Sequence, residues 1–184
     1  MNMFEPVIVD TKRLRLRPLR TEDVSIFFDM WSDPEAVRYF SFPPMQDIEQ
    51  AHARIAEKLQ SSSDGNSVIC VVESRDTGEV LGDCALFNGV PHSKRADIGY
   101  CLGRKHWGKG YMAEAADALI EHGFKRAGLR RIEADIDPRN LPSIQLIERL
   151  GFKREGYLRE RWMIGGEVAD TVLYGLIHSD RYQS

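Results

Sequence analysis

The sequence predicts an α/β (α+β) fold, with one mixed, mostly antiparallel sheet of about seven strands flanked by about four helices. Three observations lead to this expectation. The chain has 184 residues, 42% of them hydrophobic, which suits one globular domain with a core over about 13–178. Some segments alternate apolar and polar residues, while others repeat apolar residues every three or four positions. The order of these segments does not fit a regular βαβ array.

The first half of the chain begins with one strand and two helices. Residues 13–17 (RLRLR) alternate strictly and predict a strand. Thr21 is expected to cap a helix over about 22–31. A second helix is predicted over about 47–61, with Asp47 in a favourable capping position.

Three strands and a long helix follow. Residues 67–73 and 79–87 flank the turn at 76–78 (DTG), so they predict a hairpin. Residues 95–102 (RADIGYCL) predict the third strand. After a glycine-bearing turn, apolar residues share one face of a helix over about 110–127.

The last third predicts a strand, a short helix and a closing hairpin. Residues 131–136 (RIEADI) alternate as in a strand, and a helix is expected from Asn140 to Leu150. Two strands, about 156–164 and 167–177, are joined by two glycines, which accept the positive φ of a tight hairpin turn.

Charge and cysteine usage exclude several classes of protein. The net charge of −3 argues against nonspecific nucleic-acid binding, which needs basic patches. No apolar run approaches the ~20 residues that span a bilayer, and the first residues lack the basic flank of a signal peptide. Cys70, Cys84 and Cys101 show no Cys-x-x-Cys spacing, so we expect buried free thiols and no metal. The protein is expected to be cytoplasmic, without nucleic-acid or membrane partners.

The turn at residues 103–113 (GRKHWGKGYMA) has the composition of a phosphate-binding site. A strand enters it and a helix leaves it, and the first amides of a helix lack intrahelical partners at the positive end of the helix dipole. Glycines let a phosphate approach the backbone closely. A tight turn that binds nothing is the alternative.

Three phosphate ligands are compatible with this turn to different degrees. Gly103 to Lys109 matches the start of a Walker A loop, but Gly110 stands where a Ser or Thr hydroxyl should reach magnesium. Gly108, Gly110 and Ala113 match a dinucleotide fingerprint, yet only about 50 residues remain for the further βα units. Coenzyme A needs only the turn amides and no metal.

Several segments in the right order resemble one family. They are DPEAVRYF (33–40), ADIGYCL (96–102), HWGKGYMAEAADALI (106–120), RIEADIDPRNLPSIQLIERLGF (131–152), EGYLR (155–159) and D-x-x-x-Y (170–174). Together they resemble the RimJ/RimL-type branch of the GNAT superfamily of acyl-CoA-dependent N-acyltransferases. The resemblance covers nearly the whole chain.

The resemblance implies a sheet that splays open at the cofactor site and a set of acetyl-CoA-binding residues. The turn amides would hold the pyrophosphate, the end of the preceding strand would bind the pantetheine arm, and Asn140 would reach the arm or the acetyl region. The implied residues are Tyr100, Cys101, Leu102, Trp107, Gly108, Lys109, Gly110, Tyr111, Met112, Ala113, Asn140 and Ser143. Trp107 and Met112 depart from the superfamily pattern, although Trp suits this branch.

The expected chemistry is direct attack of an amine on the thioester, with no metal. Many superfamily members protonate the leaving thiolate with a tyrosine whose position here is Ile147, so Ser143 is the candidate donor. Ser143 and Asn140 are equally explained as a helix-start hydroxyl and an N-cap. A backbone amide near Cys101 or Leu102 is the expected oxyanion donor.

Asp97 is preferred as the general base because it lies on the strand that would bind the cofactor. Asp83, Glu133 and Asp135 are the alternatives, and each has the simpler explanation of a solvated strand face. His92 and His106 are expected at the surface, and Cys101 is not expected to act as a nucleophile because no histidine is placed to activate it.

The sequence therefore predicts an acetyl-CoA-dependent N-acetyltransferase acting on a primary amine, with the N-terminal α-amine of a ribosomal or other protein as the first candidate acceptor. A small amine (polyamine, aminoglycoside or amino acid) is the second. A non-catalytic acyl-CoA-binding module is a third, motivated only by the missing tyrosine. A monomer or a homodimer is equally compatible.

Overall fold

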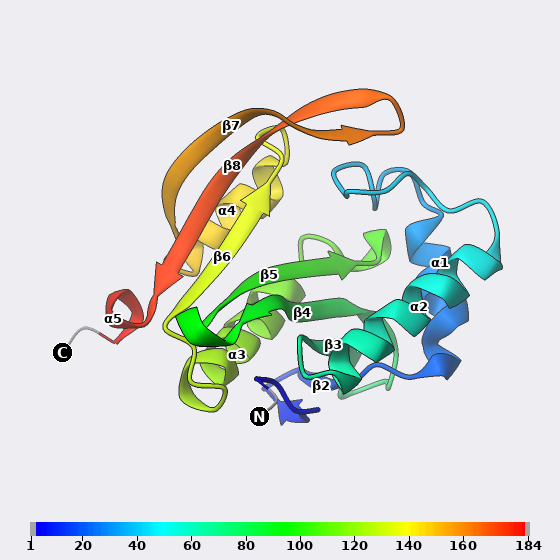
Figure 1. Ribbon diagram of the computed structural model, residues 1–184. Helices are drawn as coiled ribbons and strands as arrows, with labels where there is room; N and C mark the ends of the chain where they lie inside the picture. Colours follow the sequence, from blue (N-terminus) through cyan, green and yellow to red (C-terminus); the bar gives the residue numbers. More distant parts are fainter. Residues whose placement is uncertain (1–2, 183–184) are drawn as a thin grey trace.

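The computed structural model describes residues 3–182, which form one open eight-stranded sheet with helices on both faces (Figure 1). The strands are β1 (Val9–Asp10), β2 (Leu14–Pro18), β3 (Val68–Ser74), β4 (Val80–Val90), β5 (Arg95–Leu102), β6 (Arg131–Ile136), β7 (Lys153–Ile164) and β8 (Glu167–Ile177). The helices are α1 (Val24–Trp31), α2 (Ile48–Ser63), α3 (Tyr111–Lys125), α4 (Leu141–Arg149) and the short α5 (His178–Arg181). The strand order is β1-β2-β3-β4-β5-β6-β8-β7.

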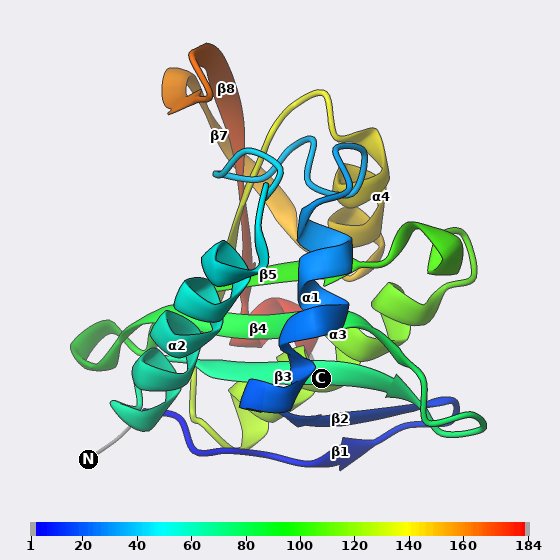
Figure 2. The same cartoon turned by 90° about the vertical axis from the view of Figure 1, so that its right-hand side faces the viewer.

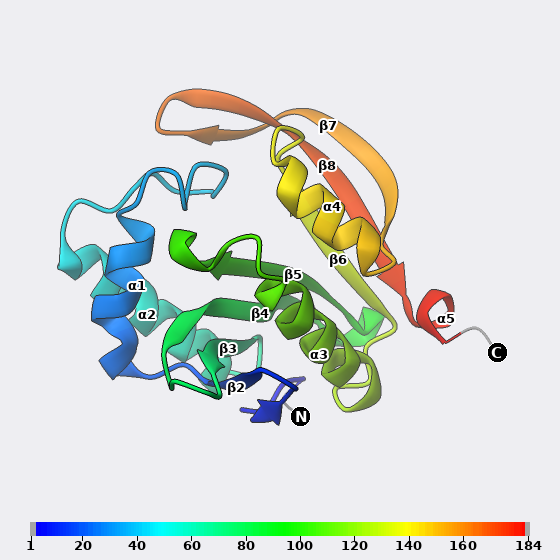
Figure 3. The same cartoon turned by 180° about the vertical axis from the view of Figure 1, so that it is seen from behind.

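Each face of the sheet is covered by its own pair of helices. Helices α3 and α4 cover one face, which we call the α3 face (Figure 3). They pack there against side chains such as Ile98 and Ile132. Helices α1 and α2 cover the opposite face, which we call the α2 face (Figure 2). They pack there against side chains such as Val71 and Cys101. Because successive residues of a strand point to opposite faces, the central strands β3, β4 and β5 contribute residues to both cores.

The centre of the sheet is open because β5 and β6 pair over only part of their length. Their parallel pairing covers 95–97 on β5 and 131–133 on β6, and stops there. Beyond this point the two strands diverge towards their C-terminal ends (Figure 1). β4 stays paired with β5 as far as Leu102, and β8 stays paired with β6 as far as Ile136. The opening is therefore held from both sides by intact antiparallel pairs.

The predicted order of elements is confirmed, and the bounds of β5 and β6 agree with the predicted ones. The sheet has eight strands rather than about seven, because the two-residue β1 pairs with β2. There are five α-helices rather than about four, because a single turn, α5, follows β8. Both missed elements are too short to show a periodic pattern in the sequence. No helix in the described part of the chain is long and apolar enough to cross a membrane.

The prediction that Thr21 caps α1 is wrong. Thr21 lies in a 3-10 turn, and its side chain makes no capping hydrogen bond. Asp23 is the N-cap residue of α1 instead, although its side chain makes no cap hydrogen bond to that helix; its carboxylate accepts a hydrogen bond of 2.8 Å from the amide of Arg20, ahead of the 3-10 turn. Two further hydrogen bonds, of 2.7 and 2.8 Å, join Asp23 to the buried guanidinium of Arg17. By contrast, Asp47 caps α2 as predicted, through the amide of Gln50.

Candidate active site

The glycine turn between β5 and α3 is built for close approach from outside. Gly108 has φ +72° and Gly110 has φ +75°, conformations that only glycine adopts without strain. A Cβ placed on Gly108 would meet no atom within 4 Å, so this side of the turn is open. Gly110 is also the N-cap of α3, and no side chain caps the helix.

The amides of this turn have no partner in the protein. Within residues 3–182, no acceptor receives a hydrogen bond from the N–H groups of residues 108–113. These groups stand at the positive end of the helix dipole of α3. Open glycines, free amides and a helix N-terminus together fit a diphosphate.

Arg13 adds positive charge beside the same turn. Its Nη1 donates to the carbonyl of Lys109 at 2.9 Å, and its Nε forms a 2.6 Å ion pair with Glu114 in the first turn of α3. Its guanidinium also lies over the ring of Tyr111, 4.6 Å from the centroid. No sequence pattern pointed to Arg13, because a tertiary contact joins it to a turn 96 residues away.

Other predicted turn residues have structural roles as well. Met112 is buried in the α3-face core, so the departure from the superfamily pattern anchors the first turn of α3. The indole Nε1 of Trp107 donates to the carbonyl of Leu102 at 2.7 Å. That carbonyl is therefore engaged by the protein, although it was among the groups expected to bind the pantetheine arm. Lys109 is exposed, and its Nζ donates to the carbonyl of Lys105.

A cavity of about 590 Å³ lies at the opening between β5 and β6 and extends across the α2 face. The structure brings five of the predicted site residues together in its wall: Asp97, Tyr100, Cys101, Asn140 and Ser143. The turn residues 107–113 lie outside the wall, beyond the end of β5. The predicted site thus consists of two neighbouring parts, a turn with free amides and a cavity with titratable side chains.

On the α3 side of the opening, two hydroxyl groups form a pair. The phenol of Tyr100 on β5 and Oγ of Ser143 on α4 are 2.7 Å apart. Burial raises the pKa of Tyr100, so the phenol keeps its proton at neutral pH. The amide of Ser143 donates to Oδ1 of Asn140 at 3.2 Å, which makes Asn140 the N-cap of α4. Ile147, at the position of the expected tyrosine, is completely buried.

The α2 side of the opening carries carboxylates. Asp97 accepts a 2.8 Å hydrogen bond from Nδ2 of Asn88, and burial raises its pKa above the ordinary value. Asp83 is buried and forms a 3.1 Å ion pair with Lys58, so it is not a solvated strand residue. Asp83 and Asp97 both line the cavity, and of these two described carboxylates only Asp97 is without an ion-pair partner.

The other two candidate bases are engaged by the protein. Glu133 forms ion pairs with Arg95 at 2.7 Å and with Arg131 at 2.6 Å. Asp135 accepts hydrogen bonds from Thr171 and from the indole of Trp162. Their lone pairs are therefore less available than those of Asp97 to accept a proton.

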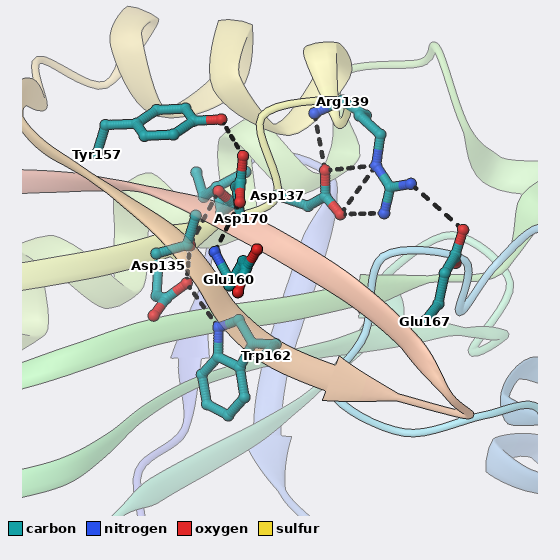
Figure 4. Close-up of polar contacts among 10 residues, drawn as sticks. Asp135, Asp137, Arg139, Tyr157, Glu160, Trp162, Glu167 and Asp170 are labelled. Carbon is teal, nitrogen blue, oxygen red and sulfur yellow. Dashed lines mark hydrogen bonds and ion pairs between the residues drawn. The ribbon is translucent and has the colours of Figure 1, made fainter.

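The β7–β8 hairpin forms the outer wall of the cavity, and a polar cluster fixes its bend (Figure 4). Asp170 accepts hydrogen bonds from the phenol of Tyr157 and from the amide of Glu160, the second at 2.7 Å. Glu160 has φ +52° within a register shift between the two strands. The hydrogen bond from its amide holds this unfavourable backbone conformation beside the cavity.

The prediction that His106 lies at the surface is wrong. It packs under the turn and is 6% exposed, and burial lowers its pKa, so it is neutral at pH 7. His92 is exposed as predicted. The three cysteines are buried free thiols, and burial raises the pKa of Cys101, which disfavours a reactive thiolate. Within residues 3–182, no group of His, Cys, Asp or Glu side chains could hold a metal ion.

Comparisons with known proteins agree with this geometry. The family described as "Acetyltransferase (GNAT) domain" matches residues 13–153. A Bacillus licheniformis protein named "uncharacterized N-acetyltransferase p20" is 39% identical over 168 residues, covering 91% of this chain and 94% of that protein. The "[ribosomal protein uS5]-alanine N-acetyltransferase" of Escherichia coli K12 is 30% identical over 182 residues, covering 95% and 92%.

The fold is shared with a solved structure of the same branch. RimJ of Mycobacterium smegmatis, in complex with CoA-disulfide, superposes with a TM-score of 0.86 at 23% identity, covering 97% of this chain and 91% of that one. Residues 13–153, which match the family, include the glycine turn and both strands that border the opening, β5 and β6. This chain belongs to the GNAT acetyltransferase family and is an N-acetyltransferase of its RimJ/RimL-like branch.

Proposed function

We propose that this enzyme transfers the acetyl group of acetyl-CoA to a primary amine, and that the preferred acceptor is the N-terminal α-amine of a peptide or protein. The observation that carries the proposal is the opening between β5 and β6, with free amides at one end and titratable groups on both faces. The 30% identity with an enzyme named for alanine N-acetylation of a ribosomal protein supports the α-amine as acceptor.

Acetyl-CoA supplies the activated acetyl group, and this chain supplies the groups that hold it. The amides of residues 108–113 would bind the diphosphate, with Arg13 adding charge beside them. The edge of β5 beyond Asp97 has no strand partner on the β6 side, so its free backbone groups would bind the pantetheine arm and include the oxyanion donor. Most of this recognition uses the backbone.

The Tyr100–Ser143 pair would protonate the leaving thiolate. Oγ of Ser143 donates its proton towards the sulfur, and the Tyr100 phenol donates in turn to Ser143, at the 2.7 Å separation seen here. The raised pKa of Tyr100 keeps the phenol in the donating form. A phenol from β5 would thus do what the tyrosine absent at Ile147 does elsewhere in the superfamily. The non-catalytic alternative rested only on that absence.

Asp97 would receive the proton of the acceptor amine, directly or through water, from the other face of the sheet. Successive residues of a strand point to opposite faces, so Asp97 and Tyr100 flank the opening from its two sides. The free energy needed to deprotonate the acceptor is small for an α-amine, because its pKa of about 8 leaves roughly a tenth of the amine neutral at pH 7. A lysine-like amine near 10.4 would need about 4–5 kcal/mol to deprotonate there.

Small cationic amines form the second candidate class of acceptor. The cavity wall contains six carboxylates and three cationic side chains, which favours positively charged ligands: Glu57, Asp83, Asp97, Asp135, Asp137 and Asp170 against Arg54, Lys58 and Arg161. A polyamine satisfies this charge pattern as well as a protonated peptide N-terminus does.

An acceptor panel tests the proposed function. Purified protein with acetyl-CoA is assayed for thiol release with peptides that have a free α-amine, the same peptides with a blocked α-amine, and spermidine. We expect turnover with the free peptides, at a higher kcat/KM than with spermidine, and none with blocked peptides. Turnover only with spermidine would make a small cationic amine the preferred acceptor in place of the peptide α-amine. No turnover with any amine would overturn the proposal.

Replacing Gly108 tests the diphosphate site. Gly108→Ala should weaken acetyl-CoA binding about tenfold or more, because a side chain would occupy the open side of the turn and hydrogen bonds to a charged group contribute about 1.5–3 kcal/mol each. Gly128→Ala is the matched control, since Gly128 has φ +68° and equally open space but lies away from the turn. Both should lose about 1 kcal/mol of folding stability. Calorimetric titration should show weaker binding for the first variant only; equal affinities would contradict the assignment.

Removing the two hydroxyls tests the proton donor. Ser143→Ala should lower kcat about a hundredfold and Tyr100→Phe about tenfold, with the double variant close to Ser143→Ala, because both act through one proton path. Tyr174→Phe is the control, since the Tyr174 phenol is bonded to Glu148 in the core and its removal should affect stability only. Independent, multiplying losses in the double variant would show that Tyr100 does not act through Ser143.

Asp97→Asn should lower activity and raise stability at neutral pH. A carboxyl whose pKa is raised in the folded state stabilises the fold while protonated, and this contribution is lost as pH rises through the raised pKa. The variant should therefore unfold at higher denaturant than the wild type at pH 7, with the difference shrinking towards pH 4. Its kcat/KM with an α-amine should fall about a hundredfold. Asp10→Asn, a change at an exposed carboxylate, should leave kcat unchanged. Full activity of Asp97→Asn would assign the base elsewhere.

A further inference from the structure

The cavity extends from the opening to α2, where Arg54 lines its wall without a hydrogen-bonding partner. Its guanidinium centre lies 3.9 Å from the ring centroid of Phe42 and 5.7 Å from that of Trp31. Nε is buried and makes no hydrogen bond, and within residues 3–182 no carboxylate forms an ion pair with this arginine. The two aromatic rings position the charge but leave its hydrogen-bonding capacity unused.

The neighbouring charges do not neutralise Arg54. Lys58, one turn further along α2, takes the Asp83 carboxylate at 3.1 Å. Asp83 and Glu57 favour the charged form of Arg54 only at longer range, and burial is the larger effect and lowers its pKa. An arginine stays charged even so, because its ordinary pKa exceeds 12. The α2 wall therefore holds a cation that the protein itself does not pair.

The carboxylates of the cavity are in the opposite situation. Five of the six accept hydrogen bonds from protein donors: Asp83 from Lys58, Asp97 from Asn88, Asp135 from Thr171 and Trp162, Asp137 from Arg139, and Asp170 from Tyr157 and Glu160. The sixth, Glu57, is exposed to solvent. A simple count of charges therefore overstates the preference of the cavity for cations.

We propose that Arg54 binds a carboxylate of the acceptor, so that the preferred substrate carries an anionic group close to the amine that is acetylated. This inference rests on the proposed function and narrows its acceptor class. A planar guanidinium that lies against two aromatic rings, with its Nε buried, presents a fixed fork of donors that matches a carboxylate. The carboxylate comes either from an acidic side chain near a peptide N-terminus or from the free carboxyl group of an amino acid.

The test compares acceptors that differ only in that charge. C-terminally amidated peptides with Glu at the second, third or fourth position are paired with the same peptides carrying Gln, and free glutamine is paired with glutamine amide. With wild-type enzyme, kcat/KM should favour at least one Glu peptide about 10- to 100-fold over its Gln partner. A preference confined to the free amino acids would identify the amino acid carboxylate as the source.

Variants of Arg54 assign the preference to this residue. Arg54→Gln should remove the preference by lowering kcat/KM for the Glu peptide while changing that for the Gln peptide less than about threefold. Arg54→Lys should keep part of the preference, because the charge stays and the planar fork is lost. Arg126→Gln, on the surface at the end of α3, removes the same charge away from the cavity and should leave the preference intact. Thermal unfolding of each variant separates misfolding from a loss of recognition.

The outcomes distinguish this inference from the function on which it rests. Efficient acetylation of peptides without any preference for Glu would overturn the role of Arg54 and leave the proposed function standing. Equal losses for Glu and Gln peptides in a folded Arg54→Gln variant would assign Arg54 to structure alone. No acetylation of any free α-amine would overturn both.

Discussion

The architecture depends on one interruption of hydrogen bonding, the end of the β5–β6 pairing after residues 97 and 133. A parallel pair that stops in mid-sheet leaves backbone groups unpaired on both strands, which is unfavourable unless another partner binds them. Full-length pairing of β4 with β5 and of β6 with β8 keeps the two halves of the sheet apart and rigid. The same interruption makes the two faces of the sheet accessible from one place.

Access to both faces of the sheet places a proton-accepting side chain and proton-donating side chains around the same opening. Asp97 projects towards α2, and the Tyr100–Ser143 hydroxyls lie towards α4, yet all line a single cavity. In a continuous sheet the strand backbones would separate a proton acceptor on one face from a proton donor on the other. The glycine turn lies just past the end of β5, so a ligand held by its amides is directed along the opened strand.

Local patterns in the sequence were sufficient for most of the fold. Alternation located β2 and β6, a capping residue located the start of α2, and the paired glycines located the last hairpin. The glycine turn was recognised because its residue types determine backbone conformation directly. The prediction for Thr21 was wrong because Asp23, which is hydrogen-bonded to the buried Arg17, is the N-cap residue of α1. The prediction that His106 is exposed was wrong because the exposure of a polar residue depends on which segments pack over it.

The parts of the site that escaped prediction are contacts between distant segments. Tyr100 and Ser143 are separated by 43 residues, and Arg13 and Lys109 by 96, so no spacing rule connects them. The unused charge of Arg54 is a property of its surroundings, since Phe42 and Trp31 lie against its guanidinium and the neighbouring Asp83 is paired with Lys58. The sequence located the glycine turn because its residue types set the backbone conformation, and it missed much of the cavity wall because side chains from distant segments form it.

The glycine turn offers backbone amides and the cavity offers side chains, so substitutions affect these two parts of the protein differently. Amide donors belong to every residue type except proline, so substitutions at exposed turn positions such as Trp107 and Lys109 would leave the diphosphate donors in place. In the proposed function, the α2 wall and the β7–β8 hairpin would recognise the acceptor through side chains, and Asp170 stabilises the bend of the hairpin. New acceptors can therefore be acquired on one side of the molecule while the acetyl donor stays the same.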